Sequence, residues 1–330
     1  MSSSLIKDHS LNCFQTVITS LAIQQGIPKE EIWYQCGLYF DIKDGINFLL
    51  DPKYKTIHSQ FKNDINFYSQ DYALLDKCIE SVDKLLVSHG PVALTVDAFE
   101  LDYTVSYKNL NLDHFIEVYE KEGEAYKIFD HYYHFEGKIT REKLVKAMES
   151  YQANFNNAIL QLYFIKAKAN FKGLTQKEIL LIVAENYNAM LGIRTIKNKD
   201  LKGYFGIQGL PPLKDRLLLT IRDGDNKEYE QFEDEIGHWF NSLKDFSNSR
   251  LNFYRLLEKH IPSHDTSFLI TASHSWSSLS NMLLKGLHTN KLTQMYERIE
   301  KKFNKIIQCE HDNLVRLSTL IVDLERNLNE

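Results

Sequence analysis

The apolar positions near the start of the chain follow the period of an amphipathic helix. Five of them fall at the spacing i, i+3, i+4, i+7 and i+8: Phe14, Val17, Ile18, Leu21 and Ala22. Ser10 and Asn12 are available as caps at its start, and Gly26 and Pro28 favour its end. A second, short helical stretch is expected over 29–40.

Farther along, the pattern changes from helix to strand. The segment 71–90 has helical periodicity, with Gly90 as its stop signal. Residues 91–99 (PVALTVDAF) then alternate as in a strand, and 114–130 has the pattern of two β-strands around a tight turn. A helix followed by antiparallel hairpins is typical of an α+β domain, which we expect to end near Lys166.

The second half of the chain is dominated by helical patterns. Thr175 and Glu178 have the spacing of a capping box, and the Gly/Pro-rich segment 203–213 interrupts the helices. From there to the C-terminus, single apolar stripes predict long helices. We therefore expect two domains, an α+β domain over 1–166 and a mainly α-helical domain over 167–330.

Composition and charge exclude several classes of function. The 330 residues are 43% hydrophobic, which suits two packed cores, and the formal net charge is −5. Acidic and basic residues are interspersed, so nucleic acid and a membrane surface are not expected as partners. No apolar run reaches the roughly 20 residues of a membrane span, and no signal peptide is evident, so we expect a cytoplasmic protein. The long last helix leaves a homodimer open.

The cysteines and histidines do not form a metal-binding pattern. The four cysteines are too widely spaced for a zinc knuckle or a disulfide framework: Cys13, Cys36, Cys78 and Cys309. The run DHYYH offers Asp130, His131 and His134, but no further nitrogen or sulfur ligand stands nearby. We expect no metal site, and each thiol has to be judged on its own.

Cys13 is a candidate nucleophile because it lies at the first turn of the first predicted helix. The backbone N–H groups there lack intrahelical acceptors, and the positive end of the helix dipole stabilises a thiolate. The same N–H groups can form an oxyanion hole. The alternative is a small buried residue, because free cysteines are among the residues most often found inside proteins.

The predicted hairpin supplies a base and a group that can orient it. With a three-residue turn over 121–123, Glu120 pairs with Glu124 and His114 lies opposite Asp130, on the same face. An imidazole beside a carboxylate is the arrangement of an oriented general base. A two-residue turn would move one of the two side chains to the other face. The alternative is a cross-strand contact with no catalytic task.

The order of these residues resembles that of the papain-like cysteine enzymes. A cysteine at a helix start, GPVALTVDAFELDY leading to a histidine on a strand, and an aspartate closing the next strand are most similar to the N-terminal domain of the butirosin biosynthesis protein H family. SRLNFYRLLEKH, the helix around Trp276 and IIQCEHDNLVRL resemble its helical C-terminal domain. The resemblance implies a papain-like first domain with Cys13, His114 and Asp130 as its catalytic residues.

The resemblance also implies acyl transfer. The named member of that family moves an aminoacyl group from an acyl carrier protein thioester to an amine of an aminoglycoside, in antibiotic biosynthesis. By analogy, Cys13 would attack a thioester on the phosphopantetheine arm of an acyl or peptidyl carrier protein, His114 would move the protons, and Asp130 would hold the imidazole. A small-molecule amine would then accept the acyl group, and the protein would need no cofactor of its own.

One departure from the papain pattern concerns the oxyanion hole. Papain-like enzymes usually place a glutamine a few residues before the cysteine, and KDHSLN contains none. Asn12 or His9 could supply that donor, or backbone N–H groups could act alone. Two other functions stay open: a cysteine hydrolase acting as peptidase, amidase or thioesterase, and a non-catalytic interaction protein with a papain-like shell.

Overall fold

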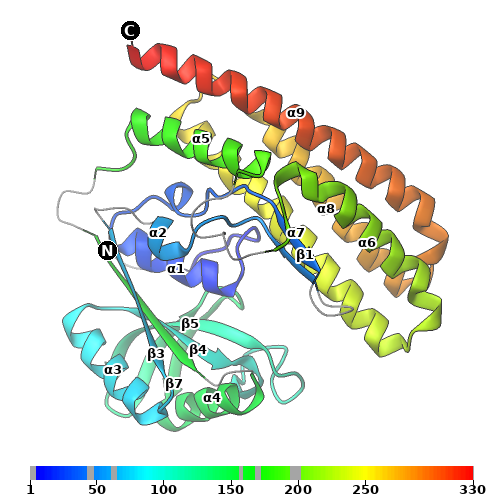
Figure 1. The fold of residues 1–330 in the computed structure, drawn as a ribbon. Coiled ribbons are helices and arrows are strands. Elements are labelled where there is room, and N and C mark those ends of the chain that lie inside the picture. The colour runs from blue at the N-terminus through cyan, green and yellow to red at the C-terminus, as the bar shows by residue number, and fades with distance from the viewer. Residues whose placement is uncertain are drawn as a thin grey trace. The chain divides into compact units, whose positions relative to one another are not determined.

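The protein is a mixed α+β chain that divides into two compact units. The first unit consists of residues 1–32 and 57–173, and the second of 33–56 and 174–330. The computed structural model describes residues 5–42, 48–60, 65–155, 159–167, 172–193 and 202–329. Figure 1 shows the elements, and each unit is considered by itself below.

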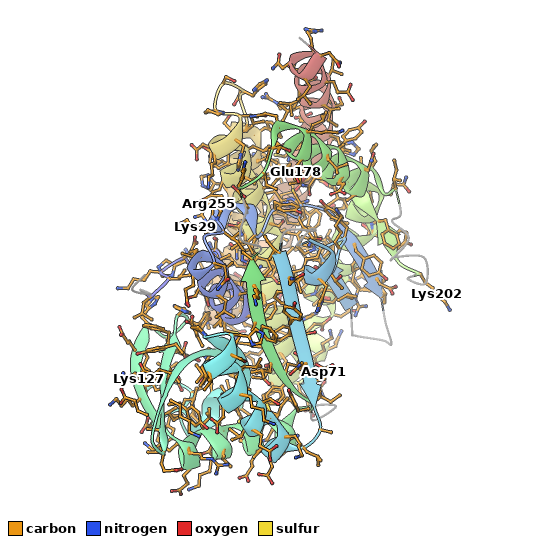
Figure 2. All side chains as sticks on the ribbon, turned by 90° about the vertical axis from the view of Figure 1, so that its left-hand side faces the viewer. Lys29, Asp71, Lys127, Glu178, Lys202 and Arg255 are labelled. Atoms are coloured by element: carbon orange, nitrogen blue, oxygen red, sulfur yellow. The ribbon has the colours of Figure 1, made fainter. Side chains whose placement is uncertain are left out.

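The first unit is built around one antiparallel sheet of six strands, in the order β3-β8-β4-β5-β6-β7. In Figure 2, Asp71 labels the edge strand β3, and Lys127 labels β6, which lies next to the opposite edge strand β7. Its elements are α1 (Cys13–Gln24), η1 (Lys29–Glu31), α2 (Ile57–Gln60), β3 (Ile65–Tyr72), α3 (Leu75–Ser88), β4 (Val92–Asp97), η2 (Ala98–Glu100), β5 (Asp113–Glu122), β6 (Ala125–Asp130), β7 (Phe135–Thr140), α4 (Arg141–Asn154) and β8 (Leu160–Ala167).

Helices cover both faces of this sheet, with α3 and α4 on one side and α1 on the other (Figure 1). On the α3 and α4 side, Val92, Leu94 and Val96 of β4 join a single buried apolar cluster. On the other side, the ring of Phe14 in α1 contacts that of Phe115 in β5, with centroids 4.9 Å apart. Every residue of β4 is buried, because this central strand has both faces covered.

The turn between β5 and β6 is shorter than predicted. A three-residue loop over 121–123 is wrong, because β5 continues to Glu122 and this residue pairs with Ala125. Gly123 and Glu124 form a two-residue turn, and Gly123 has a φ of 60°. A positive φ at the first turn position is what the tight primed turns of hairpins require, and glycine adopts it without strain.

A β-bulge interrupts the same hairpin farther from the turn. Val118 pairs with Ile128, and the next pair joins Glu120 with Lys127, so that Tyr119 is an extra residue on β5. The Tyr119 ring stacks on Phe129, with centroids 4.5 Å apart. The extra residue shifts the register by one and thereby changes which side chains share a face.

The second unit combines long helices with a small sheet of three strands, in the order β2-β1-β9. The predicted capping box of Thr175 and Glu178 is confirmed at the start of α5. Its elements are β1 (Tyr39–Ile42), β2 (Phe48–Asp51), α5 (Gln176–Leu191), β9 (Tyr204–Phe205), η4 (Gly206–Gly209), α6 (Leu210–Arg222), η5 (Asp223–Asn226), α7 (Tyr229–His260), α8 (Ser267–His288), η6 (Thr293–Met295) and α9 (Tyr296–Asn329).

A segment from the first half of the chain belongs to this second unit. Residues 33–56 lie there, so the division differs from the single boundary that we expected between 166 and 167. The helix expected over 29–40 is also wrong: only the 3-10 turn η1 forms, and strand β1 follows. Burial explains why residues 33–56 join the second unit. The ring of Phe48 packs against that of Trp239 in α7, with centroids 4.0 Å apart.

A buried ion pair joins the helices of the second unit. Nε of Arg250 lies 2.9 Å from Oε1 of Glu310, and each of the two side chains is 1% exposed. The same carboxylate oxygen accepts from the indole N–H of Trp276, and Arg250 also donates to the carbonyl of Gly37 at 3.1 Å. The guanidinium therefore links segment 33–56 to α7 and α9.

None of the helices in the described part of the chain combines the length and the apolar character that crossing a lipid bilayer requires.

Candidate active site

Cys13 is the first residue of α1, and the residue before it caps the helix. The side-chain oxygen of Asn12 accepts the N–H of Gln15 at 2.9 Å, and the Gln15 side chain accepts the N–H of Asn12 at 3.0 Å. This reciprocal pair is a capping box, which fixes where the helix begins. Cys13 is half-buried, so its thiol lies in the first turn with access to solvent.

The two side chains considered as oxyanion donors have other surroundings. The amide oxygen of Asn12 is engaged in the helix cap. His9 is exposed on the segment before α1, and its ring lies edge-on to that of His134, with centroids 6.3 Å apart. At the start of α1 the N–H of Gln15 is already accepted by Asn12, so the remaining candidates are the first two backbone N–H groups of the helix, together with the positive end of its dipole.

His114 and Asp130 form a hydrogen-bonded pair on neighbouring strands. Nε2 of His114 lies 2.7 Å from Oδ2 of Asp130, and the two side chains are 4% and 0% exposed. Because Nε2 faces the carboxylate, Nδ1 is the ring nitrogen left for another partner. Cys13 is that partner, since its side chain hydrogen-bonds to His114.

The register that brings this pair together is not the predicted one. Directly opposite pairing of His114 with Asp130 is wrong, because Glu117 pairs with Phe129 and Asp130 therefore lies diagonally across from His114. The shorter turn changes the register by an odd number of residues, and the bulge on β5 changes it by one in the opposite direction, so the net change is even. The two changes compensate, so both side chains still point to the same face, as the hydrogen bond between them requires.

The environment of His114 favours its protonated form. Burial by itself lowers the pKa of this imidazole, but the carboxylate of Asp130 and its hydrogen bond raise it, and Cys13 raises it further. The net effect raises the pKa of His114 from its ordinary value of 6.5 to about 10. Cys13 thus lies beside an imidazole that retains its proton, and such a charged neighbour is what cysteine enzymes use to activate a thiol.

Asp130 is held by more donors than the sequence suggested. Its Oδ1 accepts the backbone N–H groups of Tyr132 and Tyr133, at 3.1 and 3.0 Å. Its Oδ2 accepts the hydroxyl of Tyr103 at 3.1 Å in addition to His114. These bonds fix the orientation of the carboxylate, and through it the orientation of the imidazole.

Tyr103 is a site residue that sequence reasoning missed. It lies in the loop between β4 and β5, and its ring stacks on Phe135 at a centroid distance of 3.8 Å. Burial, followed by the charge of Asp130, raises the pKa of the Tyr103 hydroxyl, so it remains a hydrogen-bond donor. The only signal in the sequence was its position shortly before His114. A buried tyrosine there needs a hydrogen-bond partner for its hydroxyl, and the site offers a carboxylate.

Two aromatic rings lie against the imidazole. The centroids of Tyr133 and Tyr132 are 5.1 and 6.0 Å from that of His114. Tyr132 is 51% exposed, and the charge of Cys13 contributes to raising the pKa of its hydroxyl after burial. His114 is therefore shielded from water, while Cys13 and Tyr132 are accessible from the outside.

The other three cysteines lie in environments that disfavour a thiolate. Burial raises the pKa of Cys36 and that of Cys78 to about 12. Burial together with two neighbouring carboxylates raises the pKa of Cys309 to about 11. Cys13 differs from all three because an imidazole is hydrogen-bonded to it.

The run that offered metal ligands has other partners. Asp130 binds His114 and Tyr103, and His131 lies 2.9 Å from Glu117. Within the described residues, no group of three His, Cys, Asp or Glu side chains could hold a metal ion. The chemistry that the arrangement can perform is nucleophilic attack by a thiol with proton transfer through an imidazole.

Comparison with known proteins adds no assignment: the chain matches no protein-family model and no curated protein. Function has to be inferred from the geometry of the site, together with the resemblance in the sequence.

Proposed function

We propose that this protein is a cysteine-dependent acyltransferase that works through an acyl-enzyme on Cys13. The observation that carries the proposal is a series of three hydrogen-bonded side chains in the first unit. Cys13 is hydrogen-bonded to His114, and His114 to Asp130 at 2.7 Å. A nucleophile, a base and a group orienting the base are the parts that covalent acyl transfer needs.

The first half-reaction loads the enzyme. Sγ of Cys13 attacks the carbonyl carbon of a thioester, a new carbon–sulfur bond forms, and the bond to the donor thiol breaks. The departing sulfur takes a proton from the imidazolium of His114, while Asp130 keeps the ring oriented. Because one thioester replaces another, the step is close to balanced in energy and depends mainly on positioning.

The second half-reaction releases the acyl group to an amine. The amine nitrogen attacks the acyl carbon, His114 takes the proton that the nitrogen loses, and Cys13 leaves as a thiolate. In both halves a negative charge develops on the carbonyl oxygen. The first two backbone N–H groups of α1 are the proposed donors for it, since Asn12 accepts that of Gln15, and the helix dipole adds to their effect.

The resemblance to the butirosin biosynthesis protein H family supports the choice of partners. It favours a donor carried on the phosphopantetheine arm of an acyl or peptidyl carrier protein, and a small-molecule amine as acceptor, within the biosynthesis of a specialised metabolite such as an antibiotic. A hydrolase would use the same acyl-enzyme with water in place of the amine, so only the acceptor separates the two activities.

Mass spectrometry of the intact protein tests the proposal. After incubation with acyl-pantetheine thioesters, we expect an added acyl mass on Cys13, absent in Cys13→Ala and retained in the control Cys309→Ala. Cys309 is a suitable control because it is also half-buried but has no such histidine. The absence of any adduct on Cys13, from pantetheine and carrier-bound donors alike, would refute the proposal and favour a non-catalytic interaction protein.

Acceptor choice is measured on the loaded enzyme. Addition of primary amines should discharge the acyl group from Cys13 as an amide faster than water discharges it as an acid. If the acid is the sole product at every amine concentration, the protein is a hydrolase and the transferase proposal is wrong.

A further inference from the structure

A second histidine–carboxylate pair joins β5 to the residue that directly follows β6. His131 directly follows Asp130, and Glu117 is on β5, the strand that also carries His114. Nε2 of His131 lies 2.9 Å from Oε2 of Glu117, and both side chains are fully buried. Solvent and substrate cannot reach this pair, so it is not a second catalytic centre.

The pair is bonded to the chain on both sides of Cys13. Nε2 of Gln24, the last residue of α1, donates to Oε1 of Glu117 at 2.7 Å. The backbone N–H of Ile6, in the segment before α1, donates to Nδ1 of His131 at 3.1 Å. We call these four groups the Glu117 network. Cys13 lies in the sequence between Ile6 and Gln24, the two residues through which this part of the chain is bonded to Glu117 and His131.

The hydrogen bonds of this network assign the protons. Nδ1 of His131 accepts an N–H, so the ring proton is on Nε2 and is donated to Glu117. The other oxygen of Glu117 accepts from a neutral amide of Gln24. A carboxylate buried among such donors contributes little net stability to the fold. Its effect is to fix the positions of the groups that are hydrogen-bonded to it.

We propose that Glu117 and His131 are positioning residues that hold Cys13 in hydrogen-bonding contact with His114. The inference rests on the proposed function, because it assigns a role in preparing the nucleophile. The network ties the start of the Cys13 segment and the end of its helix to the two strands that carry His114 and Asp130. A displacement of about 1 Å at a reacting atom is enough to reduce a rate roughly a hundredfold.

The test is the rate at which iodoacetamide alkylates Cys13, followed by peptide mass spectrometry over the acid to neutral pH range. In the wild type, Cys13 should be alkylated faster than Cys309, the other half-buried thiol, because His114 is hydrogen-bonded to Cys13. In Gln24→Met and Glu117→Gln, we expect the alkylation rate of Cys13 to fall roughly ten- to hundredfold, towards that of Cys309.

A matched control removes a partly buried hydrogen bond between the same sheet and α3 without touching α1. The hydroxyl of Tyr126 on β6 donates to Asp83 at 2.8 Å, so Tyr126→Phe should lower the melting temperature and leave the alkylation profile in place. For His131, the asparagine variant retains an acceptor for the N–H of Ile6. His131→Asn should therefore recover part of the reactivity that His131→Leu loses.

The outcomes separate this inference from the proposed function. If the wild type alkylates as a free thiol does, the proposed function fails, and the positioning role fails with it. If wild-type Cys13 is alkylated faster than Cys309, and Gln24→Met and Glu117→Gln keep its rate while melting at lower temperature, the network is merely structural and the inference is wrong.

Discussion

His114 and Asp130 lie diagonally across two neighbouring strands, and Nε2 of the histidine is 2.7 Å from Oδ2 of the aspartate. The carboxylate is buried and accepts three further hydrogen bonds, two from backbone N–H groups and one from the Tyr103 hydroxyl. An imidazole fixed in this way presents its other nitrogen in one direction only, towards Cys13. The proposed chemistry depends on this relationship.

Removing the charge of Asp130 should impair catalysis with little effect on the fold. Asp130→Asn keeps the size of the side chain but withdraws the carboxylate that raises the pKa of His114. We expect the rate of acyl loading on Cys13 to fall roughly 10²- to 10⁴-fold, as in other enzymes with a carboxylate-oriented histidine. The measurement is a single-turnover loading assay together with NMR titration of His114. A variant as fast as the wild type would contradict the role given to Asp130.

The stability of the first unit should decrease in alkaline solution. The pKa of His114 is raised from 6.5 to about 10 on folding, so between these values the folded state holds a proton that the unfolded state releases. The stabilisation is fully present below the lower value and is lost as pH rises through the upper one, at most by about 1.4 kcal/mol per pH unit.

Urea unfolding of the wild type and of His114→Gln at several pH values measures this effect, with circular dichroism reporting on the sheet. The difference in unfolding free energy between the two proteins should shrink with rising pH. A difference that stays constant would show that His114 gains no proton affinity on folding.

The role of Asn12 can be separated into cap and oxyanion donor. Asn12→Ser retains an oxygen that can cap α1 but has no amide N–H to offer. We expect acyl loading within about threefold of the wild type, whereas losing a true oxyanion donor costs roughly 10²- to 10³-fold. Asn12→Ala, which removes the cap, should cost about 1 kcal/mol of stability in the same unfolding assay. A slow Asn12→Ser variant would instead identify the Asn12 amide as the donor.

Deleting Tyr119 should leave the site intact. The pairs on either side of the bulge, Val118 with Ile128 and Glu120 with Lys127, would become continuous without altering the register of His114. We expect the rate of acyl loading on Cys13 to change by no more than about threefold, because the side chains of β5 between His114 and Val118 keep the faces on which they lie. A loss of activity by orders of magnitude in a folded deletion variant would show that the bulge itself shapes the site.

In the second unit, breaking the buried ion pair should be costly. Glu310→Ala leaves the guanidinium of Arg250 buried without its carboxylate, and we expect a loss of about 3–5 kcal/mol in unfolding free energy. Tryptophan fluorescence reports on this unit specifically, since Trp33, Trp239 and Trp276 all lie in it. The double variant Arg250→Met, Glu310→Leu should be more stable than Glu310→Ala, and the reverse order would contradict this account.

Local patterns in the sequence determined the elements around the nucleophile. The apolar stripe from Phe14 to Ala22 predicted a helix, which is confirmed as α1, and Asn12 is confirmed as its cap. The two strands predicted over 114–130 and the long C-terminal helices also form, whereas the strand predicted over 91–99 ends at Asp97, where the 3-10 turn η2 follows. Caps and apolar periodicity are short-range properties, because each depends on residues within one or two turns or along a single strand.

Only the tertiary structure decided which residues meet. The turn at Gly123 and the bulge at Tyr119 set the register of His114 and Asp130, and two errors in the predicted hairpin cancelled because side-chain facing depends only on whether the shift is odd or even. Segment 33–56 joined the second unit through burial of Phe48 on Trp239, far away in sequence. Such contacts depend on packing between distant segments, which local periodicity does not encode.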